Sequence, residues 1–257
     1  MINLSKKIIA FDLDGTLAES KQHIEKDMSY LLCDIARVKK LAIISGGDFS
    51  QFEKQFLVSF KPKEEEKDLI YSNLILLPTS GSRRYEYDLV KKEWIMTDIE
   101  EMPFLIKEKT LKILQNFAKT GKYGIGAVIE GDDVVEDRVT QISLSALGQH
   151  APLADKLVWD PDQAKRKEMK KELELILPEV EINIGGSTTL DILPKGFNKA
   201  KGLMRLLDKL GMTKEDMLFI GDAIFPGGND YSPYEKGIES IKTSGPKDTI
   251  SIIKQWF

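Results

Sequence analysis

The feature that most constrains this 257-residue chain is an apolar run that ends in two acidic residues. Residues Ile8–Phe11 are apolar without interruption, and Asp12, Asp14 and Gly15 follow at once. A short continuous apolar run is typical of a strand that is buried on both faces, as in a parallel sheet. Because the carboxyl ends of the strands form the ligand crevice of an open α/β sheet, we expect both carboxylates to project there.

Strand-like and helix-like patterns alternate over the rest of the first hundred residues. The same alternation returns after about residue 188, with a buried strand, a helix that starts near Asn198 and a further strand before Gly221. Strand, helix and strand in succession predict a parallel sheet. We therefore expect an α/β fold whose core is a Rossmann-like, doubly wound parallel sheet. The expected core elements are strands at 7–11, 41–44, 74–78, 189–193 and 217–220 and helices at 25–37, 49–57, 198–210 and 247–256.

The middle of the chain follows a different pattern. From Arg83 onward, aromatic and polar residues alternate around a turn at 90–92, which predicts an antiparallel hairpin. Helices at 103–119 and 162–177 and strands at 123–129, 140–144 and 180–184 follow, an α+β pattern. The sequence thus predicts a core built from residues 1–82 and 188–257 and an inserted α+β cap domain at 83–187.

Composition excludes two classes of partner. The chain has 37 basic and 41 acidic residues, and no block of Lys and Arg is dense enough to follow a nucleic-acid backbone. No segment has the roughly 20 consecutive apolar residues that a spanning helix needs. We expect a cytoplasmic protein that binds neither nucleic acid nor membrane, and the choice between monomer and dimer stays open.

The two acids after the first strand require a counter-charge. Carboxylates two residues apart on one loop repel each other unless a cation or a proton lies between them. Mg²⁺ suits this position because it takes few carboxylates and readily binds phosphate oxygens. One carboxylate can then attack phosphorus and form an aspartyl-phosphate, while the other serves as general acid and base. The alternative is that Asp-Gly-Thr is only a turn after a strand.

Three more segments place polar side chains at strand ends or helix starts. Ser45 and the amides around Gly46 follow the second strand and are suited to a phosphate oxygen. Lys199 opens a helix, and Asp222 and Asp230 flank a glycine-rich turn after a buried strand. Each segment alone can be an ordinary turn or a surface residue. Together they supply, in chain order, the groups that a phosphoryl-transfer site uses.

This set resembles the four motifs of the haloacid dehalogenase superfamily. The resemblance implies that Asp12 is the nucleophile and Asp14 the general acid and base. It implies that Ser45 binds the phosphate and that Lys199 stabilises charge on the aspartate and phosphoryl group.

The resemblance also implies a magnesium site. Asp222 would hold Mg²⁺ together with Asp12 and the backbone carbonyl of Asp14. Asp230 would support the metal directly or through water, and Asn229 would orient that loop.

A closer resemblance, to eukaryotic-type phosphomannomutase, covers both core segments and the last strand of the cap. The long segment from Gly221 to Asp230 contains Pro-Gly-Gly-Asn-Asp and is its most specific part. The resemblance implies that Thr189 and Asp191 contact sugar hydroxyls. In the cap, Arg138 matches one expected arginine, but Gln149 stands where a second is expected, and a neutral amide cannot replace a guanidinium.

For this reason we expect a magnesium-dependent phosphatase that hydrolyses a sugar phosphate or a similar small phosphomonoester. A phosphomannomutase-type mutase is the alternative, because both reactions begin with phosphate transfer to Asp12. A catalytically silent phosphate-binding protein is a second alternative, since a fold alone does not grant activity. Retention of Asp12 and Asp14 argues against it.

Overall fold

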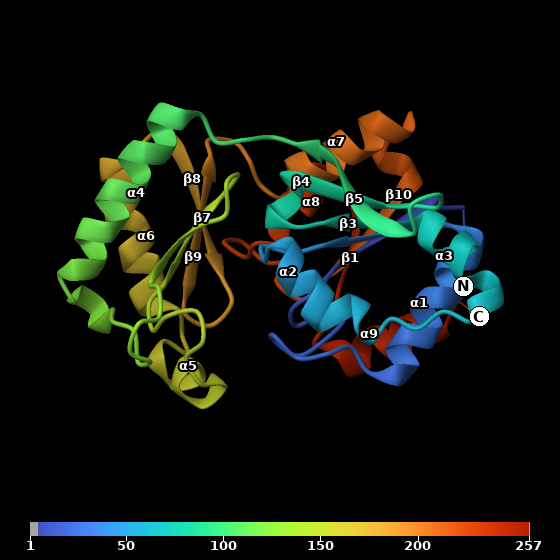
Figure 1. Ribbon diagram of the computed structural model, residues 1–257, viewed down its shortest axis with the longest axis horizontal. Coiled ribbons are helices and arrows are strands. Elements are labelled where there is room, and N and C mark those ends of the chain that lie inside the picture. Colours follow the sequence, from blue (N-terminus) through green and yellow to red (C-terminus); the bar gives the residue numbers. More distant parts are fainter. Residues whose placement is uncertain (1–4, 257) are drawn as a thin grey trace. The chain divides into compact units, whose positions relative to one another are not determined.

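The computed structural model describes residues 5–256, which form two compact units. The core unit contains the described residues up to Ile99 and from Lys199 on, and the inserted unit is Glu100–Asn198. Figure 1 shows both units in sequence colours. None of the helices within residues 5–256 is long and apolar enough to cross a membrane.

The core unit is built on a seven-stranded sheet. Its strand order is β11-β10-β1-β2-β3-β4-β5, and the pairs from β11 to β3 are parallel. The strands are β1 (Ile8–Asp12), β2 (Lys40–Ile44), β3 (Leu74–Leu77), β4 (Arg83–Asp88), β5 (Glu93–Ile99), β10 (Met217–Gly221) and β11 (Glu239–Lys242). This confirms the predicted α/β core with a parallel sheet.

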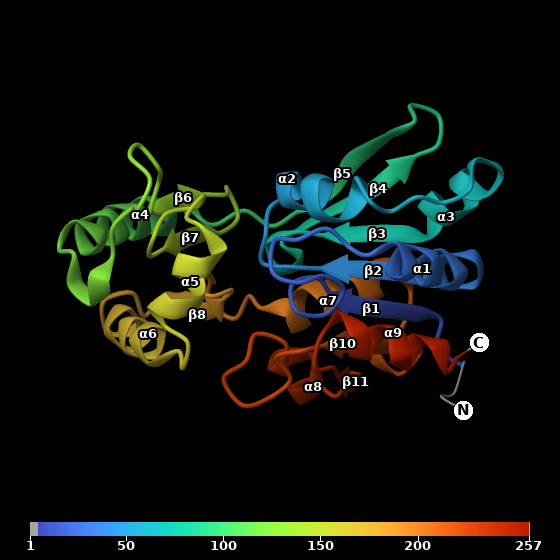
Figure 2. The same cartoon turned by 90° about the horizontal axis from the view of Figure 1, so that it is seen from below.

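Helices cover both faces of this sheet. Alternate residues of each strand point to opposite sides, so Ile9 and Phe11 join one apolar cluster while Ile8 and Ala10 join another. Figures 1 and 2 show α1 and α9 on one face and α7 on the other. The helices are α1 (Lys26–Val38), α2 (Phe49–Phe52) with the π-helical segment η1 (Glu53–Leu57), α3 (Lys67–Asn73), α7 (Lys199–Leu210), α8 (Tyr231–Glu235) and α9 (Pro246–Lys254). Short 3-10 turns lie at Glu64–Glu66, Thr79–Gly81 and Lys214–Asp216.

The inserted unit is a four-stranded antiparallel sheet packed against helices. The strand order is β6-β7-β9-β8, and one apolar cluster joins the sheet to α4 and α6. The elements are α4 (Phe104–Lys119), a 3-10 turn at Lys122–Gly124, β6 (Val135–Asp137), β7 (Ile142–Ser145), α5 (Leu153–Trp159), α6 (Ala164–Ile176), β8 (Val180–Gly185) and β9 (Thr189–Pro194). Figure 1 shows α4 and α6 on the same face of the sheet. The α+β character expected for this region is present.

The units divide at different residues from those predicted. The hairpin β4–β5 pairs with β3 and extends the core sheet, because its aromatic side packs on the core: Phe49 and Tyr85 stack with centroids 3.9 Å apart. Strand β9, expected in the core, pairs with β7 and β8 in the inserted unit. The prediction of a strand at 123–129 is wrong, since that stretch forms a 3-10 turn and a loop.

Candidate active site

Strand register brings the predicted site residues of the core unit to one edge of the sheet. Asp12, the last residue of β1, pairs with Ile44, so Ser45 lies just beyond the end of the neighbouring strand. On the other side of β1, Phe11 pairs with Ile220, which places Gly221 and Asp222 at the same level as Asp12. The motifs therefore converge because their strands are adjacent, parallel and in register.

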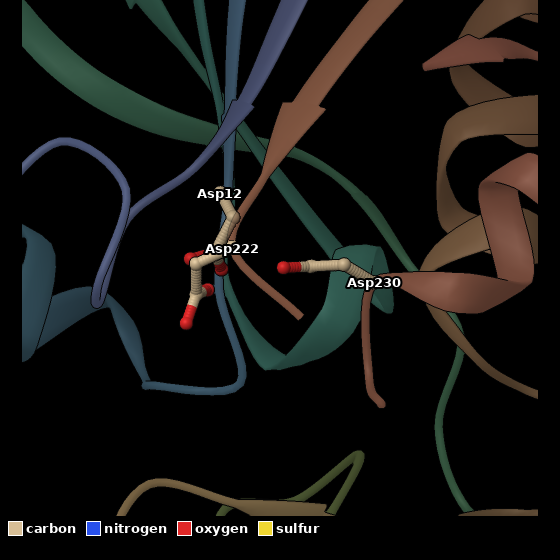
Figure 3. A group of neighbouring side chains, drawn as sticks. All are labelled: Asp12, Asp222 and Asp230. Carbon is tan, nitrogen blue, oxygen red and sulfur yellow. The ribbon is translucent and has the colours of Figure 1, made fainter. Parts of the chain in front are cut away.

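Three of the acids form a cluster. One carboxylate oxygen of each of Asp12, Asp222 and Asp230 lies within 4.8 Å of the others. Figure 3 shows Asp12 and Asp222 side by side and the side chain of Asp230 pointing toward them. Asp230 immediately precedes α8 and is fully buried. Like charges at this spacing repel each other strongly.

Lys199 supplies one positive charge to this cluster. It is the first residue of α7, its side chain is 2% exposed, and its Nζ donates to Oδ1 of Asp12 and, at 2.6 Å, to Oδ1 of Asp230. Burial lowers the pKa of Lys199, but attraction to Asp12 and Asp230 outweighs it and raises that pKa overall. The lysine therefore stays charged, yet one cation cannot balance three carboxylates.

A divalent cation would balance the remaining negative charge. Oδ2 of Asp12 is buried and has no hydrogen-bond partner among the described residues, a costly state for a carboxylate oxygen. Burial, together with Asp230 and Asp222, raises the pKa of Asp12 well above its usual range, although Lys199 opposes this. Burial and then Asp230 raise the pKa of Asp222 to about 6. A cation bound between these acids would stabilise their ionised form.

Two glycines allow these carboxylates to approach. A Cβ at Gly15 would lie 2.7 Å from Oδ2 of Asp222, and one at Gly221 would lie 2.5 Å from Oδ2 of Asp230. Real side chains do not tolerate such contacts, so the two motifs need glycine here for space. The two glycines thus leave room for three carboxylates that could hold one metal ion.

The side chain of Asp14 is held elsewhere. Its Oδ1 accepts from the backbone N–H of Lys21 and from Nε2 of Gln55, both at 2.8 Å, and its Oδ2 accepts from Nε2 of Gln51 at 2.9 Å. The cluster of three acids does not include this carboxylate. Contact between the backbone carbonyl of Asp14 and a metal stays a prediction.

Gln51 and Gln55 were not predicted from the sequence. The available signal was two glutamines spaced i, i+4 on the helix that Asp48 caps, where Oδ1 of Asp48 accepts from the N–H of Gln51 at 3.0 Å.

Ser45 opens a tightly bonded loop at the end of β2. It is 2% exposed, and its Oγ accepts from the N–H of Gly47 at 3.1 Å. The next loop braces it, because Thr79 and Ser80 donate backbone N–H groups to the carbonyls of Gly47 and Ser45, each at 2.8 Å. The phosphate-binding roles of Ser45 and Gly46, and the role of Asn229, stay predictions.

The bracing loop itself is under constraint. Thr79, Ser80 and Gly81 have φ of 50°, 57° and 82°, an uncommon run of left-handed residues. Gly81 packs against Gly202 of α7 so closely that a Cβ at Gly81 would lie 2.7 Å from the Cα of Gly202. The loop after β3 therefore ties the Ser45 loop to the helix that carries Lys199.

The substrate-binding residues expected in the inserted unit form two groups. Arg138 forms an ion pair with Glu136 at 2.7 Å, and its Nη2 lies 3.5 Å from Oε1 of Gln149. The buried Lys156 donates to the carbonyl of Gln149 at 2.8 Å. It was not predicted from the sequence, because it stands outside every motif.

Thr189 and Asp191 lie on the same face of β9. The hydroxyls of Thr189 and Ser145 are 3.3 Å apart, while Oδ1 of Asp191 accepts from Ser143 at 2.6 Å and from Gln141 at 2.8 Å. Contact of either residue with a sugar stays a prediction.

Solved structures share this fold. The IMP-bound, N-terminally truncated IMP-nucleotidase of Plasmodium falciparum aligns with a TM-score of 0.68 at 15% identity, over 97% of this chain and 67% of that one. A haloacid dehalogenase-like hydrolase from Bacteroides thetaiotaomicron aligns with a TM-score of 0.60 at 19% identity, over 98% and 100% of the two chains. These similarities establish the haloacid dehalogenase fold.

The sequence comparisons are more specific. The phosphomannomutase of Encephalitozoon cuniculi is 26% identical over 97% of this chain and 93% of its own length. A probable phosphomannomutase of Caenorhabditis elegans is 26% identical over 95% and 93%. The family model for eukaryotic phosphomannomutase matches residues 28–257. The chain is an enzyme of the haloacid dehalogenase superfamily that transfers or hydrolyses phosphate groups, and it belongs to the eukaryotic phosphomannomutase family.

Proposed function

We propose that this protein is a phosphomannomutase-type phosphosugar mutase that requires Mg²⁺. The observation that carries the proposal is the Asp12–Lys199 pair within the three-acid cluster, in a chain that matches phosphomannomutases over nearly its whole length. This reverses the preference for hydrolysis that Gln149 suggested. The family match and the cation that Lys156 adds beside Gln149 support the mutase alternative.

The core unit carries out the phosphoryl transfer. Asp12 attacks phosphorus, a bond forms between its carboxylate oxygen and phosphorus, and the bond to the sugar oxygen breaks. Asp14 gives a proton to that leaving oxygen and later takes one from the hydroxyl that attacks the aspartyl-phosphate. Lys199 stays charged beside Asp12 and stabilises the negative charge of the transferring group.

Asp12, Asp222, Asp230 and the backbone carbonyl of Asp14 would hold Mg²⁺. The ion would neutralise phosphoryl oxygens and the excess carboxylate charge of the cluster. Ser45 and the amide of Gly46 bind another phosphoryl oxygen at the end of β2.

The inserted unit recognises the rest of the substrate. A mutase holds a sugar bisphosphate as intermediate and therefore needs cations for the phosphate that is not reacting. We assign this role to Arg138 and Lys156, which both contact Gln149. Thr189 and Asp191 offer a hydroxyl and a carboxylate to sugar hydroxyls.

Hydrolysis is the second candidate, and a specific observation favours it. Glu136 already neutralises Arg138, and Gln149 carries no charge, so the distal phosphate meets less positive charge than two free arginines would provide. Water, activated by Asp14, would then attack the aspartyl-phosphate in place of the sugar.

Product analysis separates these candidates. The protein is incubated with mannose 1-phosphate, Mg²⁺ and a trace of hexose bisphosphate, with Asp12→Asn as the inactive control. We expect mannose 6-phosphate to form faster than inorganic phosphate. The opposite order would identify a phosphatase, and no product from sugar or aryl phosphates would identify a silent binding protein.

A pair of variants tests the role of the inserted unit. Gln149→Arg should raise the ratio of mannose 6-phosphate to inorganic phosphate, and Arg138→Gln should lower it. Lys112→Gln, at an exposed lysine of α4, is the matched control and should leave the ratio unchanged.

A further inference from the structure

The carboxylate of Asp14 is held at both oxygens by neutral donors. Gln51 and Gln55 each donate an amide N–H to a different oxygen, at 2.9 and 2.8 Å, and the N–H of Lys21 adds a third bond at 2.8 Å. The three groups that donate to Asp14 are all uncharged amides. Its orientation therefore depends on hydrogen bonds and not on a neighbouring charge.

The helix that carries these glutamines is built to present them together. Asp48 caps its first turn, and Gln51 and Gln55 lie one turn apart. Nε2 of Gln51 also donates to Oε1 of Gln55 at 2.9 Å, so the two amides orient each other. Gln55 is 3% exposed and lies in the π-helical segment Glu53–Leu57, a local widening that is frequent at functional sites.

A second contact fixes this helix to the loop after Asp14. The backbone carbonyl of Gln55 accepts from the N–H of Ile24 at 3.3 Å, and the loop residue Lys21 donates to Asp14 itself. The loop and the helix thus enclose the carboxylate from two sides. An aspartate has two rotatable side-chain bonds, and fixing both of its oxygens removes that freedom.

We propose that Gln51 and Gln55 are positioning residues that hold the Asp14 carboxylate in the orientation from which it exchanges a proton with the sugar oxygen. The inference rests on the proposed role of Asp14 as general acid and base. Accurate placement of such a group governs its efficiency, and loss of a supporting residue typically costs roughly 10- to 100-fold.

An aryl phosphate with a good leaving group separates the two chemical steps. Its phenolate leaves without a proton, so Asp12 can form the aspartyl-phosphate whether or not Asp14 is well placed. Breakdown still requires Asp14 to take a proton from the attacking hydroxyl or water. A positioning defect should therefore leave the first release of phenolate intact and slow the turnover that follows.

The test measures burst and steady-state release with Gln51→Met and Gln55→Met, which keep length and remove the donor. Lys54→Met, at an exposed position of the same helix, is the matched control. We expect a burst of about one equivalent in both glutamine variants and a steady rate lower by roughly 10- to 100-fold. The control should match the wild-type protein.

Two results would overturn the inference: steady rates equal to that of the control, or burst and steady rate falling together with the melting temperature. If Gln55→Met does not fold, Gln51→Met and Gln51→Leu decide, because Gln51 is partly exposed and both changes remove the donor. Asp14→Asn separates this inference from the proposed function. If Asp14→Asn turns over like the wild-type protein, the role of Asp14 is wrong; if only Asp14→Asn is slow, the glutamines do not position it.

Discussion

Removing the charge of Asp222 should stabilise the metal-free protein at neutral pH. In the folded protein the pKa of Asp222 is raised to about 6 by burial and by Asp230, against 3.8 for an unperturbed aspartate. The folded state therefore binds this proton more tightly than the unfolded state, and the free energy of unfolding falls as pH rises through this window. The full shift corresponds to about 3 kcal/mol, of which roughly half falls between pH 5 and pH 7.5.

Hydrogen exchange of the backbone amides of β1 and β10 in EDTA measures opening of the core unit directly. Between pH 5 and pH 7.5 the free energy of unfolding of the wild-type protein should fall by on the order of 1 kcal/mol more than that of Asp222→Asn. Asp208→Asn, at an exposed aspartate of α7, is the matched control and should follow the wild-type protein. Equal pH dependence in Asp222→Asn and the wild-type protein would refute the assignment of repulsion to this cluster.

Mg²⁺ should also stabilise the folded wild-type protein. A cation that binds only the folded state stabilises it, and protons compete for the same carboxylates, so stabilisation should be larger at pH 7.5 than at pH 5. Asp222→Asn should gain little from the ion at either pH. An equal gain would show that the ion binds elsewhere.

The remaining predictions concern single positions. Asp12→Asn should lower turnover by at least roughly 10³-fold while the circular dichroism spectrum is unchanged, because it removes the nucleophile and keeps the shape of the side chain. Gly221→Ala should weaken Mg²⁺ binding roughly 10- to 100-fold in calorimetry, because its methyl group would displace the Asp230 carboxylate, 2.5 Å away. Gly202→Ala should lower the free energy of unfolding in urea by about 1–3 kcal/mol, because its Cβ would lie 2.4 Å from the carbonyl of Ser80.

The core of the site could be predicted because its residues occupy positions that the sheet dictates. Asp12, Ser45 and Asp222 each follow a buried apolar strand, and adjacent parallel strands end at one edge. The role of Lys199 could not be predicted from its position alone, since a lysine at a helix start is ordinary by itself. Its assignment depended on the accompanying motifs, and the structure places it against Asp12 and Asp230.

The parts that were missed depend on tertiary packing. Gln51 and Gln55 bond to Asp14 across 37 and 41 residues of chain, a separation that no local pattern encodes. The apolar pattern of β9 is typical of a buried strand whether its neighbours are parallel or antiparallel. The sheet to which β9 belongs could therefore not be assigned from periodicity alone. The hairpin β4–β5 was recognised, but its partner strand was not.

The position of β10 has a consequence for biosynthesis. β10 lies next to β1 in the sheet, although more than two hundred residues separate the starts of the two strands. Until the ribosome has made β10, one edge of β1 lacks its partner, and an unpaired edge strand is a site for association with other chains. The nascent chain should therefore need shielding along β1, and neither Lys199 nor Asp222 exists to complete the catalytic cluster until the last quarter of the chain emerges.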